Sequence, residues 1–182
     1  MTEPPLLILS GDKQAGKTTL CTRIAAMARK NGVDTGGVIS PALLCRGRKT
    51  GIAALDVKTR NWRQIAVLRG EGRTGLETGQ WSFFPERLQW ANQVLRAATP
   101  CTLLFVDELG PLELERGEGW TAGIEWLDEK HYCAAVAVVR PALIPAALQR
   151  WPHAFIRLAG PGARGKPAAE ALFRQLGIYG SK

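Results

Sequence analysis

The sequence predicts an α/β fold, with an open, mainly parallel sheet, helices on both faces and a small antiparallel hairpin insertion. Two observations favour this fold. Short apolar runs such as Leu6–Ser10 and Cys133–Val139 alternate with segments whose apolar residues recur at helical spacing. Strands that are apolar on both sides are typical of parallel sheets covered on both faces. Between residues 52 and 68, two strand-like runs flank a short turn, which indicates the hairpin.

The first half of the chain opens with a strand, a loop and a helix. Apolar residues follow helical spacing up to Arg29 and Lys30, and Asn31-Gly32 then forms a natural helix end. Pro41 stops the second strand. The predicted elements are strand Leu6–Ser10, helix Gly16–Lys30, strand Gly36–Pro41, and hairpin strands Ile52–Val57 and Trp62–Leu68 joined by Lys58–Asn61. The glycine-rich stretch Gly70–Gly79 is either a mobile lid or a plain linker.

The second half continues the alternation, and Thr99-Pro100 and Leu109-Gly110-Pro111 mark breaks. The expected elements are helix Phe83–Ala98, strand Thr102–Val106, helix Gly119–Lys130, strand Cys133–Val139, helix Ala142–Arg150, strand Ala154–Leu158 and helix Ala168–Leu176. A flexible basic connector, Gly160–Pro167, leads to the last helix. We expect one domain over residues 1–182, with 160–182 as the basic connector and C-terminal helix.

Composition excludes several classes of protein. The 182 residues are 46% hydrophobic and 22% charged, as in ordinary globular proteins. No apolar run is long enough to span a bilayer, and the N-terminus lacks the features of a signal peptide, so we expect a cytoplasmic protein without a membrane partner. The four cysteines lack metal-site spacing, which predicts reduced, mostly buried thiols.

The first loop carries a phosphate-binding pattern, the Walker A motif. Residues 11–18 fit G-x-x-x-x-G-K-[ST] between a strand and a helix. The glycines let backbone amides turn toward a polyphosphate, Lys17 supplies charge to its β- and γ-phosphates, and the Thr18 hydroxyl can bind Mg²⁺. An ordinary glycine turn would not need Lys17 and Thr18 in register with both glycines. The predicted nucleotide-binding residues are Gly11, Asp12, Lys13, Gln14, Ala15, Gly16, Lys17, Thr18 and Thr19.

An acidic pair follows the strand Thr102–Val106 and completes a Walker B pattern. Asp107 is predicted to hold Mg²⁺, through water, because Mg²⁺ keeps several waters and takes few carboxylates. Glu108 is predicted to be the general base that activates the attacking water. The alternative for Glu108 is a solvated strand end.

The carboxyl ends of parallel strands meet at one rim of a sheet, so the phosphate loop, Asp107-Glu108 and Arg140 are expected there together. Arg140 is either a catalytic arginine that neutralises γ-phosphate charge or a surface residue at a strand end. Glu113 either orients the site or Arg140, or is a plain surface acid. Lys13 either contacts phosphate or is solvated.

The net charge is +8, and one stretch concentrates basic residues. Such a stretch is either a solvated face or a surface for polyanions. Its members are Arg46, Arg48, Lys49, Lys58, Arg60, Arg63, Arg69 and Arg73.

Several motifs together resemble the small nucleoside-triphosphatase family that includes the cancer-related nucleoside triphosphatase. The resemblance covers about residues 6–158 and is carried by residues 7–20, Gly36–Pro41 and Arg48–Ile52. Its most specific piece is Asp107-Glu108-Leu109-Gly110-Pro111-Leu112-Glu113, where the family usually has D-E-I-G-x-M-E. The resemblance implies a RecA-like P-loop fold and Mg²⁺-dependent hydrolysis of ATP, GTP and other nucleoside triphosphates.

The predicted function is therefore hydrolysis of nucleoside triphosphates to diphosphate and phosphate, with broad base tolerance and with Lys17, Glu108 and Arg140 as catalytic residues. One alternative is a nucleotide or small-molecule kinase, in which Glu108 or Asp107 activates an acceptor hydroxyl. The other is a nucleotide-gated module that contacts nucleic acid or protein through residues 46–73.

Overall fold

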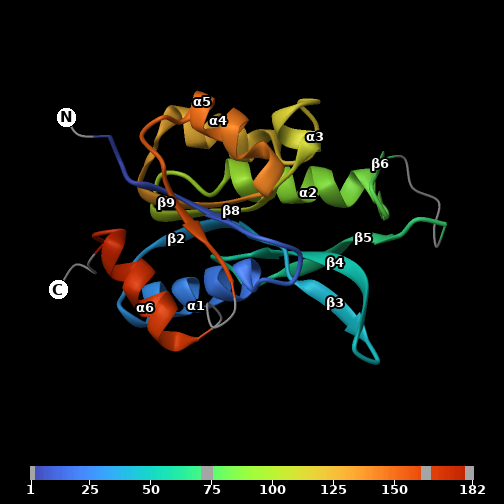
Figure 1. Cartoon of the computed structure of the whole chain (residues 1–182), viewed down its shortest axis with the longest axis horizontal. Coiled ribbons are helices and arrows are strands. Elements are labelled where there is room, and N and C mark those ends of the chain that lie inside the picture. The colour runs from blue at the N-terminus through green and yellow to red at the C-terminus, as the bar shows by residue number, and fades with distance from the viewer. Residues whose placement is uncertain (1–2, 71–75, 161–164, 179–182) are drawn as a thin grey trace.

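The structure is a computed structural model that describes residues 3–70, 76–160 and 165–178. Within these ranges, ten strands form one sheet in the order β10-β1-β9-β8-β2-β4-β5-β7-β6, and β3 pairs with β4 outside this path. The sheet lies between two layers of helices, which Figure 1 shows above and below it. The predicted fold class is confirmed.

The parallel part of the sheet consists of β10, β1, β9, β8 and β2. Its strands are β1 (Leu6–Ser10), β2 (Thr35–Ile39), β8 (Cys101–Leu109), β9 (Tyr132–Val139) and β10 (Phe155–Leu158). Because β9 lies between β1 and β8, the phosphate loop and the acidic pair are held one strand apart at the same rim. The hydroxyl of Ser10, the last residue of β1, donates to the carbonyl of Val139 at the end of β9 over 2.8 Å.

The two helical layers follow from the alternation within the buried strands. In β1, Leu6 and Ile8 join the core beneath one layer, while Leu7 and Leu9 join the core beneath the other. The first layer holds α2 (Pro85–Arg96), α3 (Pro111–Leu114), α4 (Thr121–Glu129), a short 3₁₀ turn (Pro141–Leu143) and α5 (Ile144–Arg150). The second layer holds α1 (Lys17–Lys30) and α6 (Lys166–Gln175). Both faces of the parallel strands are thus covered, as their continuous apolar runs require.

The antiparallel part is larger than the single hairpin that the sequence predicts. It comprises β3 (Ala42–Cys45), β4 (Arg48–Asp56), β5 (Trp62–Leu68), β6 (Leu76–Thr78) and β7 (Trp81–Phe83). The predicted turn at Lys58–Asn61 is present, and Asp56 caps it by accepting from the Lys58 amide over 2.9 Å and from the Thr59 hydroxyl over 2.6 Å. β4 begins at Arg48, four residues before the predicted start, because β3 pairs with the added residues.

Smaller differences concern element ends and thiols. Phe83 ends β7, and the helix after it begins at Pro85. The prediction of mostly buried thiols is wrong for two of the four cysteines. Cys21 and Cys101 are buried, whereas Cys45 and Cys133 are exposed. Residues 71–75 of the predicted Gly70–Gly79 loop and residues 161–164 of the connector lie outside the described residues. Among the described residues, no helix is both long enough and apolar enough to cross a membrane.

Candidate active site

The phosphate loop lies between β1 and α1, and its backbone has the conformations that its glycines permit. Gly11 and Gly16 have φ values of 138° and 97°. A Cβ atom on Gly11 would lie 2.6 Å from the carbonyl oxygen of Ala159, so the loop approaches the end of β10 as closely as glycine allows. The Lys17 ammonium donates to the carbonyls of Gly11 and Asp12 over 2.6 and 2.8 Å. Phosphate oxygens would offer this ammonium stronger, charged partners.

Asp107 lies at the centre of the rim, near the end of β8, and is 1% exposed. The Ser40 amide donates to its Oδ2 over 3.1 Å, and the Ser40 hydroxyl donates to its backbone carbonyl. Burial, and next the charge of Glu108, raise the pKa of Asp107 to about 7, while the contacts with Ser40, the Thr18 side chain and Lys17 oppose this rise. The chain therefore holds an acid that is costly to ionise beside the start of α1.

The residues at this point fit a magnesium ion. Asp107 Oδ1 is a buried carboxylate oxygen without a hydrogen-bond partner among the described residues. Such an orphaned acceptor is the kind of group that a cation satisfies. The described residues contain no cluster of three or more His, Cys, Asp or Glu side chains suited to a metal. Mg²⁺ in nucleotide sites needs only one or two carboxylates, together with hydroxyl, water and phosphate oxygens, so Asp107 and Thr18 suffice.

Glu108 and Arg140 form an ion pair beside Asp107. Arg140 Nε donates to Glu108 Oε1 over 3.0 Å, and their side chains are 42% and 39% exposed. A Cβ atom on Gly110 would lie 3.3 Å from the Arg140 guanidinium, so the absence of a side chain at Gly110 leaves room for the pair. The predicted base and the predicted catalytic arginine are thus brought together, and Arg140 holds Glu108 in place in the nucleotide-free chain.

Glu113 is not the plain surface acid that the sequence leaves open. Its carboxylate accepts from the Gly110 amide over 2.7 Å and from the Trp120 amide over 3.1 Å. Burial raises the pKa of Glu113, and these hydrogen bonds oppose the rise. Glu113 therefore positions the start of α3 and the segment that leads to α4, next to the ion pair.

Lys49, which the sequence places only within the basic stretch, lies beside the candidate site. Its ammonium lies 4.8 Å from the centroid of the Trp81 ring. Burial lowers the pKa of Lys49, Glu108 and Asp107 act to raise it, and Arg140 and Lys13 add to the lowering. A half-buried cation on β4 therefore faces the charged groups of the rim. Had the strand been predicted from Arg48, alternation would have placed Lys49 on the buried side with Gly51 and Ala53.

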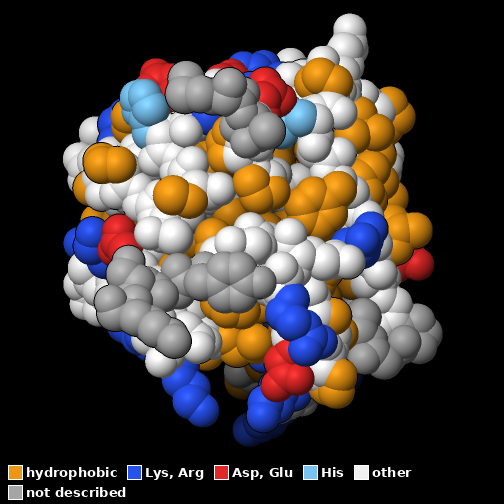
Figure 2. All heavy atoms as spheres, turned by 90° about the vertical axis from the view of Figure 1, so that its left-hand side faces the viewer, with side chains coloured by type: hydrophobic (Ala, Val, Ile, Leu, Met, Phe, Trp, Pro, Cys, Tyr) orange, Lys and Arg blue, Asp and Glu red, His pale blue; other side chains and the backbone are white. Residues whose placement is uncertain are grey.

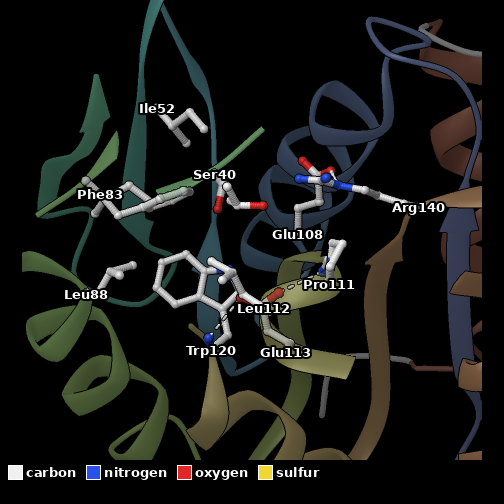
Figure 3. Close-up of a pocket in the computed structure, with 13 residues that line it drawn as sticks. Ser40, Ile52, Phe83, Leu88, Glu108, Pro111, Leu112, Glu113, Trp120 and Arg140 are labelled. Carbon is white, nitrogen blue, oxygen red and sulfur yellow. Dashed lines mark hydrogen bonds and ion pairs between the residues drawn. The ribbon is translucent and has the colours of Figure 1, made fainter. Parts of the chain in front are cut away.

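A pocket adjoins the ion pair on the side of the antiparallel strands. Its volume is about 40 Å³. Figure 3 shows Ile52, Phe83 and Leu88 on one side of it and Glu108 with Arg140 on the other, with Ser40 between them. The pocket is apolar at one end and charged at the end nearest the acidic pair.

The basic stretch does not form one uniform face. Lys58 pairs with Asp34 over 3.6 Å, and Arg69 pairs with Glu77 over 2.8 Å. The Arg63 guanidinium lies over the Trp90 ring, and Arg73 falls outside the described residues. Figure 2 shows Lys and Arg side chains elsewhere as well, mostly in the lower half of that face, toward the layer of α1 and α6. Positive charge is therefore spread over the surface.

Comparison with known proteins gives consistent matches. A family model described as NTPase matches residues 6–142. The nucleoside-triphosphatase THEP1 of Methanopyrus kandleri is 31% identical over 113 residues, which are 62% of this chain and 61% of that protein. The THEP1 of Methanocaldococcus jannaschii is 27% identical over 111 residues, which are 60% of this chain and 64% of that protein. These matches span less than two thirds of the relatives' length.

Two solved structures have a similar fold. The crystal structure of THEP1 from the hyperthermophile Aquifex aeolicus gives a TM-score of 0.65 at 16% identity, over 95% of this chain and 99% of that chain. The solution structure of a human cancer-related nucleoside triphosphatase gives a TM-score of 0.66 at 18% identity, over 96% of this chain and 97% of that chain. At these identities the likeness concerns the fold alone.

Proposed function

The chain belongs to the NTPase family whose model matches residues 6–142, and from this premise we propose that it hydrolyses nucleoside triphosphates to the diphosphate and phosphate. The family membership confirms the resemblance seen in the sequence. One observation carries the proposal. The phosphate loop with Lys17 follows β1, and the acidic pair Asp107-Glu108 lies near the end of β8, so the two meet at the same rim, one strand apart.

Binding of the triphosphate rests on the loop and the start of α1. The loop amides and the first amides of the helix have few intrahelical partners and suit an anion. Lys17 exchanges its two carbonyl partners for phosphate oxygens. Thr18 and Asp107 would hold Mg²⁺. When bound, this ion would neutralise charge on the β- and γ-phosphates.

Glu108 accepts the proton of the attacking water, and a base in this position must first be free to accept it. In the nucleotide-free chain, Arg140 occupies Glu108 Oε1. A γ-phosphate attracts the guanidinium, because phosphate carries more negative charge than one carboxylate. We infer that Arg140 moves toward this phosphate, which releases the base and places a positive charge beside the transferred group.

Phosphate release from a panel of nucleoside triphosphates tests the proposal, with native chain, Glu108→Gln and Lys17→Ala compared at equal concentration. Glu108→Gln is expected to bind nucleotide normally and to lower turnover by about 100- to 10,000-fold, the usual contribution of a general base. Lys17→Ala is expected to weaken binding roughly 10- to 150-fold, because about 1.5–3 kcal/mol of charge-assisted hydrogen bonding is lost.

The same assay also tests base tolerance, the Mg²⁺ site and the role of Glu108. Similar rates with ATP and GTP support broad base tolerance, and loss of activity with a chelator supports the Mg²⁺ site. Full activity in Glu108→Gln would remove Glu108 as the base. Binding of nucleic acid or protein through residues 46–73 stays a prediction from the sequence, and several cations of this stretch already have partners within the chain. The cytoplasmic location also stays a prediction from the sequence.

A further inference from the structure

Ser40 directly follows β2 and lies beside Asp107 at the rim. β2 pairs with β8 on one side and with β4 on the other. The carbonyl of the next residue, Pro41, accepts from the Ala53 amide of β4 over 2.9 Å. Ser40 is therefore held between a strand of the parallel part and a strand of the antiparallel part.

Two groups of Ser40 hold Asp107 at two points. The backbone amide donates to the carboxylate Oδ2 over 3.1 Å, and the hydroxyl donates to the backbone carbonyl. A carboxylate without such contacts turns easily about its last torsion, which has broad energy wells. The amide contact limits this rotation, and the hydroxyl contact fixes the backbone from which the side chain projects. Oδ1 is left as the carboxylate oxygen without a hydrogen-bond partner among the described residues.

The hydroxyl contact lies at an irregular point of β8. The pairing of β8 with β9 is regular as far as Asp107 and resumes at Leu109, so Glu108 is an extra residue, as in a β-bulge. A bulge interrupts the hydrogen-bond ladder and turns a side chain to a new direction. Ser40 holds the backbone from the β2 side, at the point where pairing with β9 is interrupted.

We propose that Ser40 is a positioning residue that presents Asp107 Oδ1 to the Mg²⁺ of the bound nucleotide. The proposal rests on the proposed function, because it uses the same metal and the same phosphate site. Ser40 does not bind the metal in this role and acts through Asp107. Removal of a partner that orients a metal ligand typically lowers metal affinity or activity by about 10- to 100-fold.

Binding of Mn²⁺ to the chain in the presence of ADP tests the proposal, because Mn²⁺ prefers the same oxygen ligands as Mg²⁺. The electron paramagnetic resonance signal of free Mn²⁺ measures this binding. Ser40→Ala keeps the amide contact and loses the hydroxyl contact, so it is expected to weaken Mn²⁺ binding about tenfold, at the lower end of that range. Ser40→Thr keeps a hydroxyl and should bind Mn²⁺ like the native chain.

Two further variants complete the series. Ser40→Cys, whose thiol is a weak donor, should fall between Ser40→Ala and Ser40→Thr, so the test does not depend on one variant folding. Ser82→Ala is the matched control, because Ser82 is a buried serine of β7 whose hydroxyl donates to Glu77 over 2.8 Å. It should leave Mn²⁺ binding unchanged, and ADP affinity measured without metal should be the same in all four variants.

A double-mutant cycle separates positioning of Asp107 from general damage to the fold. In the Asp107→Ala background, Ser40→Ala is expected to have no further effect on Mn²⁺ affinity, because the ligand that it positions is missing. Loss of affinity by the same factor in both backgrounds would overturn the proposal. Unchanged affinity in Ser40→Ala, or an equal loss in Ser40→Thr, would also overturn it.

Phosphate release from nucleoside triphosphate distinguishes this proposal from the proposed function. Phosphate release together with Mn²⁺ affinity that does not depend on Ser40 would overturn the positioning role and leave hydrolysis standing. Mn²⁺ affinity that depends on Ser40 through Asp107, in a chain that releases no phosphate, would support the positioning role and reject the proposed function. If both proposals hold, the Mg²⁺ concentration for half-maximal phosphate release should rise about tenfold in Ser40→Ala.

Discussion

The parallel part of the sheet and its antiparallel part contribute to the site in different ways. The parallel part carries the phosphate loop after β1, Asp107 and Glu108 in β8, and Arg140 after β9. The antiparallel part carries Lys49 and, in the lining of the pocket, Ile52, Ile65 and Phe83. In the parallel part, the predicted site residues lie at or just after strand ends, where the topology alone gathers them. In the antiparallel part, the side chains project from a strand surface, where only register brings them to the site.

This difference suggests a division of work. The parallel part would hold the phosphates and the metal and would also supply Glu108 and Arg140, while the antiparallel part would add only Lys49 beside the group in transfer. Loss of Lys49 should then change turnover, whereas loss of Lys17 in the phosphate loop should change nucleotide affinity.

Lys49→Met offers the largest expected effect in the antiparallel part. Its cation faces Glu108, Asp107 and Arg140, so its loss is expected to lower turnover about tenfold, or about 1.4 kcal/mol, with nucleotide affinity near native. Arg48→Met is the matched control, because Arg48 precedes it on the same strand and is exposed. Steady-state turnover and equilibrium nucleotide binding separate the two quantities. A loss of affinity like that of Lys17→Ala would break the division.

The sequence predicts the parallel part well because its signals are local. The phosphate loop is a fixed spacing of residues, and the Walker B pair is a short apolar run followed by acids, so both can be read without knowing their neighbours. The rim then follows from the rule for parallel strands.

The antiparallel part is less predictable because its strands depend on one another. β6 and β7 have three residues each, too few for a period to appear. β4 extends back to Arg48 only because β3 pairs with it, and this extension places Lys49. Glu113 binds the amide of Trp120, seven residues further on, and the pocket joins strands and helices from distant segments. No single window of the sequence contains these contacts.

Asp107 gives a second test of the comparison. It is a buried carboxyl group in the parallel part, and its Oδ1 has no hydrogen-bond partner among the described residues. The pKa of Asp107 in the folded chain, about 7, lies above the ordinary aspartate value of 3.8, so between these pH values the folded chain retains a proton that the unfolded chain has lost. Stability from this residue is complete below the lower value and is lost as pH rises through about 7.

With chelator and without nucleotide, the free energy of unfolding of the native chain is therefore expected to fall by about 1 kcal/mol more than that of Asp107→Asn between about pH 6 and about pH 8. Urea unfolding at both pH values measures this. Asp56→Asn in the antiparallel part is the control, and it should lose turn-capping hydrogen bonds and stability at both. An equal fall in native and Asp107→Asn chains would show that Asp107 is not the source.

Arg140→Met is expected to have the smallest effect on stability, and it tests whether the ion pair with Glu108 serves function. The pair is 42% and 39% exposed, and pairs with such exposure contribute at most about 1 kcal/mol. Arg150 forms a comparable pair with Asp128 over 2.6 Å, at 49% and 38% exposure, on the α4–α5 side of the molecule. Arg150→Met therefore controls for the loss of an arginine that is paired with a carboxylate.

Both variants should unfold within about 1 kcal/mol of the native chain, but only Arg140→Met should change turnover. If Arg140 transfers from Glu108 to the γ-phosphate, its loss lowers the rate at saturating nucleotide, because positive charge is missing when the γ-phosphate is transferred. If Arg140 only holds Glu108 back, its loss raises that rate, because the base is then always free. An unchanged rate would show that Arg140 is only a surface residue at the end of β9. The ion pair would then have no effect on the activity of Glu108.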